Sequence, residues 1–405
     1  MKTAVCLLAA AAGALTADAA AVATIRNVPV DYPTIQQAVN ASYIGDTVII
    51  APGTYTEMIN LYDQHLPSII SRDPDDPAIV AATILQGGIT LSSWYSPQGT
   101  VRLSGLTILG DGLYLGWSSP QGIVLVANNI IAFGYTGVLV DSINLAEVRI
   151  INNRIEDTTY GILSQGGAGS DTLVMNNLLA WNDVGLHGAI GNASHNDLRH
   201  HFVAAARLEG EGAFHSNYVG RNLGVGVQVF GLQPFTVHNN FIVANRDGLL
   251  LGKHTFAINN TIAANTGVGV AFAGYGLDAV RNCIIYANGT AVTDPLGTPN
   301  IAYSCSNVPL AGVGNFVADP LFAEAAAGDY HLTPASPCIN RGDPGYDWNP
   351  AVFDYDGDLR VIGGRLDVGA DETAAASTPV PGDMNGDGVL DGLDIPLFVQ
   401  ALLSQ

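Results

Sequence analysis

Oxygen-bearing side chains recur at alternate positions near the end of the chain. From Asp383 to Asp394 they occupy positions 1, 3, 5, 9 and 12 of a loop, and Gly388 occupies position 6. This spacing is typical of a calcium-binding loop, in which glycine permits a sharp turn and the carbonyl at position 7 adds a ligand. A solvated acidic tail is the alternative. The expected Ca²⁺ ligands are Asp383, Asn385, Asp387, Val389 (through its carbonyl), Asp391 and Asp394.

A second group of polar side chains is concentrated in the middle of the chain. Five of the nine histidines fall between residues 187 and 215, and the second of only two lysines follows at Lys253. Such groups can bind acidic sugars or transfer protons. We expect His187, Arg199, His200 and Lys253 to contact a substrate in one groove. A polar surface loop is the alternative, and no catalytic residue can be assigned, because no acid–base set is evident.

Composition excludes some classes of function. The 405 residues carry a formal net charge of −21, so they offer no basic patch for nucleic-acid phosphates. Hydrophobic residues make up 48% and charged residues 13%, which indicates a folded rather than a disordered chain. An acidic surface suits an extracellular setting that is rich in divalent cations.

The first nineteen residues have the pattern of a signal peptide. Lys2 precedes an apolar run over 4–15, and Ala17-Asp18-Ala19 follows as a cleavage site. No later segment is long enough to span a membrane, so we expect a secreted or cell-surface protein. Without Cys6, three cysteines remain and at most one disulfide can form within the chain. Pairing of Cys305 with either Cys283 or Cys338 is open.

The elements that must position these groups are repeats. Paired polar residues, mostly Asn-Asn, precede apolar pairs, and steps of 24, 24, 40, 23, 20 and 22 separate the second members at residues 129, 153, 177, 217, 240, 260 and 282. Periods near 22 with short β-branched runs favour a parallel β-helix, whereas a leucine-rich repeat would need regular leucines. Asparagine tolerates left-handed turns and can form amide ladders along the stack, so these residues are interpreted as structural. The step of 40 suggests an insertion of about 16 residues, which would protrude and carry the histidines.

Three segments add resemblances to known families. A predicted helix over 32–39 and a strand–turn–strand pattern over 45–55 resemble the opening of secreted right-handed parallel β-helix proteins of the pectin-lyase-like superfamily. The runs Asp319-Pro-Leu-Phe322, Gly328-Asp-Tyr-His-Leu332, Ser336-Pro-Cys-Ile339 and Asp367-Val-Gly-Ala-Asp-Glu372 resemble the terminal module called choice-of-anchor Q. The calcium loop and the helix expected from Asp394 onwards resemble one dockerin repeat.

The dockerin resemblance has two departures. Dockerins have two packed repeats, and this sequence holds one. Gly392 and Leu393 stand where dockerins often carry the hydroxyl side chains that contact a cohesin, which argues against a cohesin partner. The apolar face of the repeat still needs a cover, and three remain open: the end of the β-helix, a second copy of the chain in a dimer, or a cell-surface protein partner.

The predicted fold class is all-β, a right-handed parallel β-helix with a small EF-hand or dockerin-like helical appendage. The expected units are a signal peptide over 1–19, the β-helix with its N-terminal cap over 20–318, the end of the β-helix over 319–372, a linker over 373–381 and the calcium repeat over 382–405. Two functions fit. The favoured one is a carbohydrate-binding or surface-structural protein with a calcium-binding attachment module. The alternative is a lyase or hydrolase of an acidic polysaccharide, as the resemblance implies.

Overall fold

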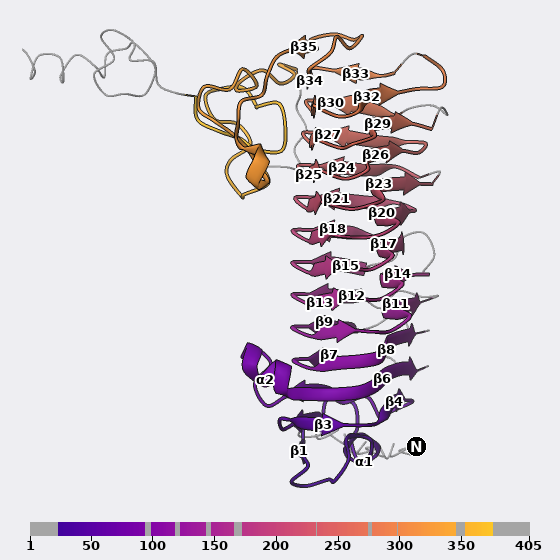
Figure 1. Ribbon diagram of the computed structural model, residues 1–405. Coiled ribbons are helices and arrows are strands. Elements are labelled where there is room, and N and C mark those ends of the chain that lie inside the picture. The colour runs from indigo at the N-terminus through magenta and orange to yellow at the C-terminus, as the bar shows by residue number, and fades with distance from the viewer. Residues whose placement is uncertain are drawn as a thin grey trace, which may run out of the picture.

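The chain winds into a tall stack of short parallel strands (Figure 1). A computed structural model describes residues 23–93, 99–117, 122–142, 147–165, 172–231, 233–273, 278–297, 299–345 and 353–375. The predicted parallel solenoid is confirmed. Its first wall is a 13-stranded parallel sheet, because each coil adds one strand beside that of the previous coil. These strands are β1 (Ile25–Val28), β2 (Thr47–Ile50), β5 (Ser68–Ser71), β7 (Thr100–Ser104), β9 (Ile123–Ala127), β12 (Glu147–Ile151), β15 (Thr172–Met175), β18 (Asn192–Ser194), β21 (Gly212–His215), β24 (Phe235–His238), β27 (Thr255–Ile258), β30 (Ala279–Arg281) and β33 (Ile301–Ala302).

Two further walls complete each coil. In the first coils they are built from β3 (Gly53–Tyr55), β4 (Met58–Tyr62) and the long strands β6 (Thr83–Ser93) and β8 (Thr107–Trp117). The second wall continues with β10 (Ile130–Ala132), β13 (Arg154–Glu156), β16 (Leu178–Ala180), β19 (Asp197–Arg199), β22 (Tyr218–Gly220), β25 (Phe241–Val243), β28 (Thr261–Ala263), β31 (Ile284–Tyr286), β34 (Cys305–Ser306) and β35 (Phe316–Val317). The third wall continues with β11 (Thr136–Ser142), β14 (Tyr160–Ser164), β17 (Val184–Ala189), β20 (Ala204–Glu209), β23 (Val225–Phe230), β26 (Asp247–Leu251), β29 (Val268–Phe272) and β32 (Thr290–Thr293).

Alternation along each strand builds the core. In β12, Val148 and Ile150 are buried whereas Glu147, Arg149 and Ile151 are partly exposed. The inward side chains are mainly Val, Ile and Leu and stack into one continuous hydrophobic core. Each coil alone is too small to bury such a face, so the stack supplies the stability.

A ladder of asparagines runs along the first corner, between the first and second walls. The Nδ2 of Asn129 donates to Oδ1 of Asn153 at 3.0 Å, and the bond repeats up the stack. The ladder comprises Asn129, Asn153, Asn177, Asn196, Asn217, Asn240 and Asn260. The preceding residue has a positive φ, for example 57° at Asn152. The predicted structural role of these amides is therefore confirmed.

The predicted 16-residue insertion is wrong. Asn196 is a ladder member, so the step of 40 from Asn177 to Asn217 divides into two ordinary coils of 19 and 21 residues. The sequence pattern missed it because His195 takes the place of the usual first asparagine. The last pair is also shifted by one residue, because Cys283 rather than Asn282 accepts the bond from Asn260.

A second ladder lines the second corner, between the second and third walls, five residues after the first. It comprises Thr158, Asn182, His201, Asn222, Asn245, Asn265 and Asn288. His201 replaces asparagine in one coil. Its main-chain N–H donates to Asn222 Oδ1 at 2.8 Å, and its Nδ1 lies 3.3 Å from the carbonyl oxygen of Asn182. The imidazole is fully buried.

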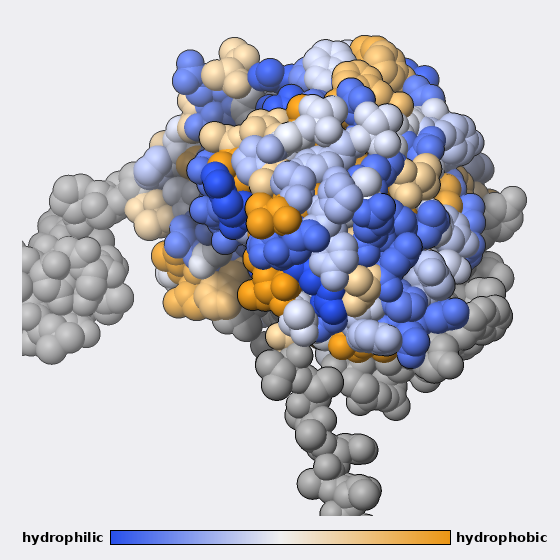
Figure 2. Space-filling model, turned by 90° about the horizontal axis from the view of Figure 1, so that it is seen from below, coloured by the Kyte–Doolittle hydropathy of each residue, from blue (hydrophilic) through white to orange (hydrophobic). Residues whose placement is uncertain are grey.

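The N-terminal end of the stack is covered as expected. Helix α1 (Ile35–Asn40) begins after Thr34, whose hydroxyl accepts a bond from the main-chain N–H of Gln37, and it buries Ile35, Ala38 and Val39. A second short helix, α2 (Pro77–Ala82), lies beside the early coils. Seen from below, this end presents mainly hydrophilic residues with separate hydrophobic ones (Figure 2), as a solenoid cap requires.

The described residues after 318 add no further coil. They contain β36 (Phe322–Glu324), the 3₁₀ helix η1 (Ala325–Ala327) and β37 (Asp329–Leu332). We call these elements, together with residues 333–345 and 353–375, the C-terminal module. The module folds back along the side of the final coils (Figure 1). Tyr330 and Ala370 pack on Phe241 and Val243 of β25. The described part of the segment predicted as the end of the β-helix thus packs against the side of its last coils.

The residues predicted to form the signal peptide, most of the predicted linker and the predicted calcium repeat lie outside the described residues. No helix among the described residues is long and apolar enough to cross a membrane.

Candidate functional site

Exposed apolar side chains follow the second corner on four of five consecutive coils. The remaining coil, between those of Phe133 and Trp181, carries Asp157 and Thr159 at the equivalent positions. The exposed side chains include Phe133 (69% exposed), Tyr135 (70%) and Leu223 (66%). These side chains, together with the partly buried His200 ring that stacks on Trp181, are called the corner stripe: Phe133, Tyr135, Trp181, His200, Phe202 and Leu223. Large apolar side chains that gather on one surface line, rather than singly, indicate a binding surface.

The second ladder positions this stripe. The residue before each ladder member has a positive φ, as at Trp181 (58°) and His200 (62°), and so does Phe133 (66°) at the same point of an earlier coil, before Gly134. This backbone conformation turns the chain outward at the same point of every coil, while the following amide is held inside. Because coils repeat at about 4.8 Å, side chains at equivalent positions lie in a row along the solenoid axis.

One ring contact lies within the stripe, and two more lead away from it. Trp181 and His200 stack with centroids 4.4 Å apart and planes inclined by 9°. Tyr135 contacts Tyr160 at 5.7 Å, and Tyr160 contacts His187 at 5.4 Å, so a line of rings leads from the corner onto the third wall. Burial lowers the pKa of His200, and the positive charges of Arg199 and Arg221 lower it further. The His200 imidazole is therefore neutral at pH 7 and offers an uncharged ring face.

The four substrate-contact residues predicted from the sequence lie on different parts of the coil. Arg199 and His200 are neighbours at the end of β19, and Arg199 is engaged with Asp197 through an Nε–Oδ1 bond of 2.7 Å and lies over the Tyr218 ring at 5.6 Å. His187 is on β17 in the third wall. Lys253 is exposed in the turn between β26 and β27, three coils beyond His187. The structure brings His200 and, through Tyr160, His187 to the corner stripe.

A row of polar side chains on the third wall includes residues that the sequence did not single out. His187 pairs in register with Arg207, and Arg207 pairs with Gln228. The His187 Nδ1, Arg207 Nε and Gln228 Oε1 atoms are buried and have no hydrogen-bond partner among the described residues. Burial lowers the pKa of His187, while the nearby Glu209 raises it and Arg207 lowers it. The register between neighbouring strands places these three side chains in one row, and this register is seen only in the folded structure.

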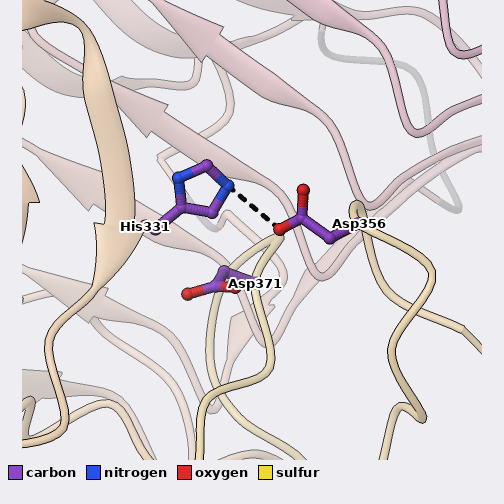
Figure 3. Close-up of side chains that lie close together, drawn as sticks. All are labelled: His331, Asp356 and Asp371. Carbon is purple, nitrogen blue, oxygen red and sulfur yellow. Dashed lines mark ion pairs between the residues drawn. The ribbon is translucent and has the colours of Figure 1, made fainter.

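A histidine–aspartate cluster lies in the C-terminal module (Figure 3). His331 Nδ1 is 2.6 Å from Asp329 Oδ1, and its Nε2 is 3.0 Å from Asp356 Oδ2 without a well-aligned hydrogen bond. Buried Asp371 completes the group, although its Oδ2 already accepts bonds from the Leu332 main-chain N–H and the Thr373 hydroxyl. The Asp356 contact, together with Asp329, raises the pKa of His331 to about 9. The imidazolium thus acts as the counter-ion of these carboxylates.

Beneath this cluster, one arginine is surrounded by buried acids. The Arg360 guanidinium donates to the carbonyl oxygens of Ala370, Asp367 and Gly369, at 3.0, 3.2 and 2.7 Å. Glu372 accepts main-chain bonds from Ile362 and Asp367. Burial raises the pKa of Glu372 to about 8, against the attraction of Arg360. These contacts tie the end of the module to itself.

Comparisons with known proteins agree with the architecture. A family profile described as "Right handed beta helix region" matches residues 94–276. The solenoid is a right-handed β-helix. No curated protein matches the sequence.

Among solved structures, the right-handed β-helix is similar to pectate lyase Pel9A, with 13% identity, a TM-score of 0.46 and coverage of 84% of this chain and 90% of that one. It is also similar to the periplasmic alginate epimerase AlgG, with 11% identity, a TM-score of 0.44 and coverage of 68% and 77%. A third is the A-module of the Azotobacter vinelandii mannuronan C-5 epimerase AlgE4, with 12% identity, a TM-score of 0.43 and coverage of 70% and 95%. Identities this low carry no functional assignment.

Proposed function

We propose that this β-helix is a secreted or cell-surface protein that binds an extended polysaccharide along the corner stripe. The observation that carries the proposal is the row of rings at the second corner, in which the exposed Trp181 stacks on the partly buried His200. A sugar ring has an apolar face of C–H groups, which packs on the negative face of an aromatic ring. Rigid aromatic side chains also lose little conformational entropy on binding.

The periodicity of the stripe supports a chain-like ligand. Equivalent positions repeat at about 4.8 Å along the axis. This spacing is close to the length of one residue in an extended β-1,4-linked glycan, so sugars along one chain can meet the rings on the coils that carry them. The acidic net charge of −21 and the neutral rings favour a neutral glycan over a polyuronate at this surface.

A glycan panel tests the proposal. Full-length protein should be retarded in native affinity gels that contain neutral β-linked polysaccharides such as xylan, mannan or soluble cellulose derivatives. Retardation should persist at 0.5 M NaCl (a concentration of roughly this size screens surface charges almost completely). Unchanged mobility in every neutral gel would contradict the proposal.

The calcium repeat is proposed as an attachment module on the sequence pattern alone. Asp383, Asn385, Asp387, Asp391 and Asp394 provide oxygen donors of the kind that Ca²⁺ prefers, and Val389 provides a carbonyl. Calorimetry on the full chain should detect one Ca²⁺ equivalent that Asp383→Ala and Asp387→Ala each remove. A heat signal that both variants retain would refute the assignment.

A second candidate is a lyase or hydrolase acting on an acidic polysaccharide. The observation that favours it is the row His187, Arg207 and Gln228, with Glu209 close by. One buried polar atom of each side chain in this row has no hydrogen-bond partner among the described residues. A cation there could pair with a uronate carboxylate while a neutral imidazole accepts a proton. Assays for reducing ends and unsaturated products on pectin, alginate and glycosaminoglycans, with and without Ca²⁺, separate the candidates. Product that disappears in Arg207→Ala would favour the enzyme; binding without product favours the first proposal.

A further inference from the structure

Two buried cysteines meet where the C-terminal module joins the solenoid. Cys305 lies on β34 in the last coils, and Cys338 lies in the module; both are completely buried. They belong to one hydrophobic cluster with Ile284 from the solenoid and Leu332, Ile339 and Val368 from the module. The two side chains are therefore packed in the same buried contact region.

The surroundings fix both side chains. The Cys305 thiol lies 3.5 Å from the carbonyl oxygen of Ala318, and the main-chain N–H of Cys305 donates to the Cys283 carbonyl at 2.9 Å. On the module side, the Cys338 N–H donates to Ser336 Oγ at 3.1 Å, and the Cys338 carbonyl accepts from the Val368 N–H at 3.0 Å. The backbones of Cys305 and Cys338 are thus held by separate hydrogen bonds, while their side chains pack in the same cluster.

The third cysteine is engaged elsewhere. Cys283 occupies the end of the asparagine ladder, where its sulfur is 3.4 Å from the main-chain nitrogen of Asn260. In register, Cys305 lies beside Ile284, while the main-chain N–H of Cys283 donates to Ser304 Oγ at 3.1 Å. Cys283 belongs to the main core, and Cys305 to the cluster under the module. Of the two pairings open from the sequence, the structure favours the one with Cys338.

We propose that Cys305 and Cys338 form a disulfide that clamps the C-terminal module to the last coils of the β-helix. The oxidant is a small-molecule or protein disulfide. The Cys338 or Cys305 thiol loses its proton and attacks the oxidant's S–S bond, which releases one thiol. The second cysteine then attacks the mixed disulfide and releases the other thiol, so two electrons pass to the oxidant. The cross-link closes a loop of 33 residues between positions 305 and 338 and secures the coils at the end of the solenoid, where fraying begins.

Direct chemical mapping tests the pairing. Contact with Cys305 and burial raise the pKa of the Cys338 thiol, so exchange in the folded state is slow. The full-length protein should therefore be held with excess oxidised glutathione a few degrees below its unfolding midpoint, where local opening gives access. After an acid quench, denaturation and alkylation, we expect Cys283 to be alkylated. We also expect to find a pair of peptides linked by a disulfide between Cys305 and Cys338. Full alkylation of Cys305 and Cys338, or a link through Cys283, would overturn the pairing.

Thermal unfolding tests the clamp separately. Oxidised protein should melt several degrees above the reduced form. Cys283→Ser, a conservative change that keeps a hydrogen-bonding group in the ladder, should retain both the cross-link and this redox-dependent shift. Cys305→Ala and Cys338→Ala should abolish the shift, whatever their own stability. A mapped cross-link with identical melting of oxidised and reduced protein would overturn the clamp, although not the pairing.

Discussion

The indole of Trp181 lies flat against the imidazole of His200, with the two rings 4.4 Å apart and inclined by 9°. The two residues come from consecutive coils and share a left-handed backbone conformation. Burial and the positive charges of Arg199 and Arg221 lower the pKa of His200, so the stack is uncharged at neutral pH. The stack joins two coils into one platform.

His200 should contribute to binding through its ring face rather than its charge. Replacement by alanine removes half of the platform and should weaken glycan binding about fivefold, whereas His200→Phe keeps an uncharged ring and should bind as tightly as wild type. Affinity gels compare the three proteins under identical conditions. Loss of binding in His200→Phe would indicate that the imidazole nitrogens, not the ring face, carry the contact.

The asparagine ladder should be a major source of stability. Asn217 Oδ1 accepts from the Asn196 main-chain N–H and Nδ2, at 2.9 and 3.0 Å, and Asn217 Nδ2 donates to Ala193 and Asn240. Asn217→Ala leaves these buried groups without hydrogen-bond partners and should lower the free energy of unfolding by about 3 kcal/mol. Denaturant unfolding measures the loss, with exposed Asn60→Ala as the control. Equal stability of the two variants would show that the ladder is dispensable.

Part of the fold could be predicted from sequence because its signals are local. Asn-Asn pairs before apolar residues marked the corners, and Thr34 marked the start of the capping helix. The sequence pattern failed in two kinds of coil. In one, another residue takes the ladder position, as Cys283 does; in the other, the first asparagine of the pair is missing, as before Asn196. Asn182, Asn222, Asn245 and Asn265 each follow a member of the first ladder by five residues, and this offset would have indicated the second ladder as well.

The candidate site depended on relationships that are not local. Phe133, Trp181 and His200 differ in type, so no sequence repeat groups them, and only the shared corner position brings them into one row. Arg207 acquires its place beside His187 from strand register. The His331 cluster joins residues that are distant in sequence: Asp356 follows His331 by 25 positions, and Asp371 follows Asp356 by 15. Only the folded module brings them together.

Acid should destabilise the β-helix through buried neutral histidines. Burial lowers the pKa of His201 and His215 to about 4 and that of His238 to about 3. Since the unfolded chain binds these protons near pH 6.5, stability is lost as pH falls below that value. The loss between pH 7 and 5 should be about 2 kcal/mol for each of the deeply buried His201 and His238.

His201→Asn provides a matched test of this acid effect. Asparagine occupies the equivalent ladder position in the neighbouring coils, at Asn182 and Asn222. The variant should lose less stability than wild type between pH 7 and 5, measured by denaturant unfolding. An equal loss in both proteins would show that His201 does not contribute to the acid sensitivity.

Alkali should loosen the C-terminal module instead. The pKa of His331 is raised to about 9, so the stabilisation by its ion pairs is complete below pH 6.5 and is lost as pH rises through 9. Ionisation of Glu372, whose pKa burial raises to about 8, acts in the same direction. An NMR titration of the imidazole should give a midpoint near 9 for wild type and a lower one for Asp356→Asn. A wild-type midpoint near 6.5 would contradict the ion-pair network.

The central claim is that the corner stripe binds a polysaccharide, and one calorimetric comparison tests it most directly. Wild type, Trp181→Ala and the control Tyr43→Ala, an exposed ring at the far N-terminal end, are titrated with the glycan that retards the protein most strongly. The stripe predicts that Trp181→Ala weakens binding by at least about tenfold, roughly 1.4 kcal/mol, while Tyr43→Ala binds as wild type. Unchanged affinity in Trp181→Ala, in a protein with wild-type melting, would contradict the account.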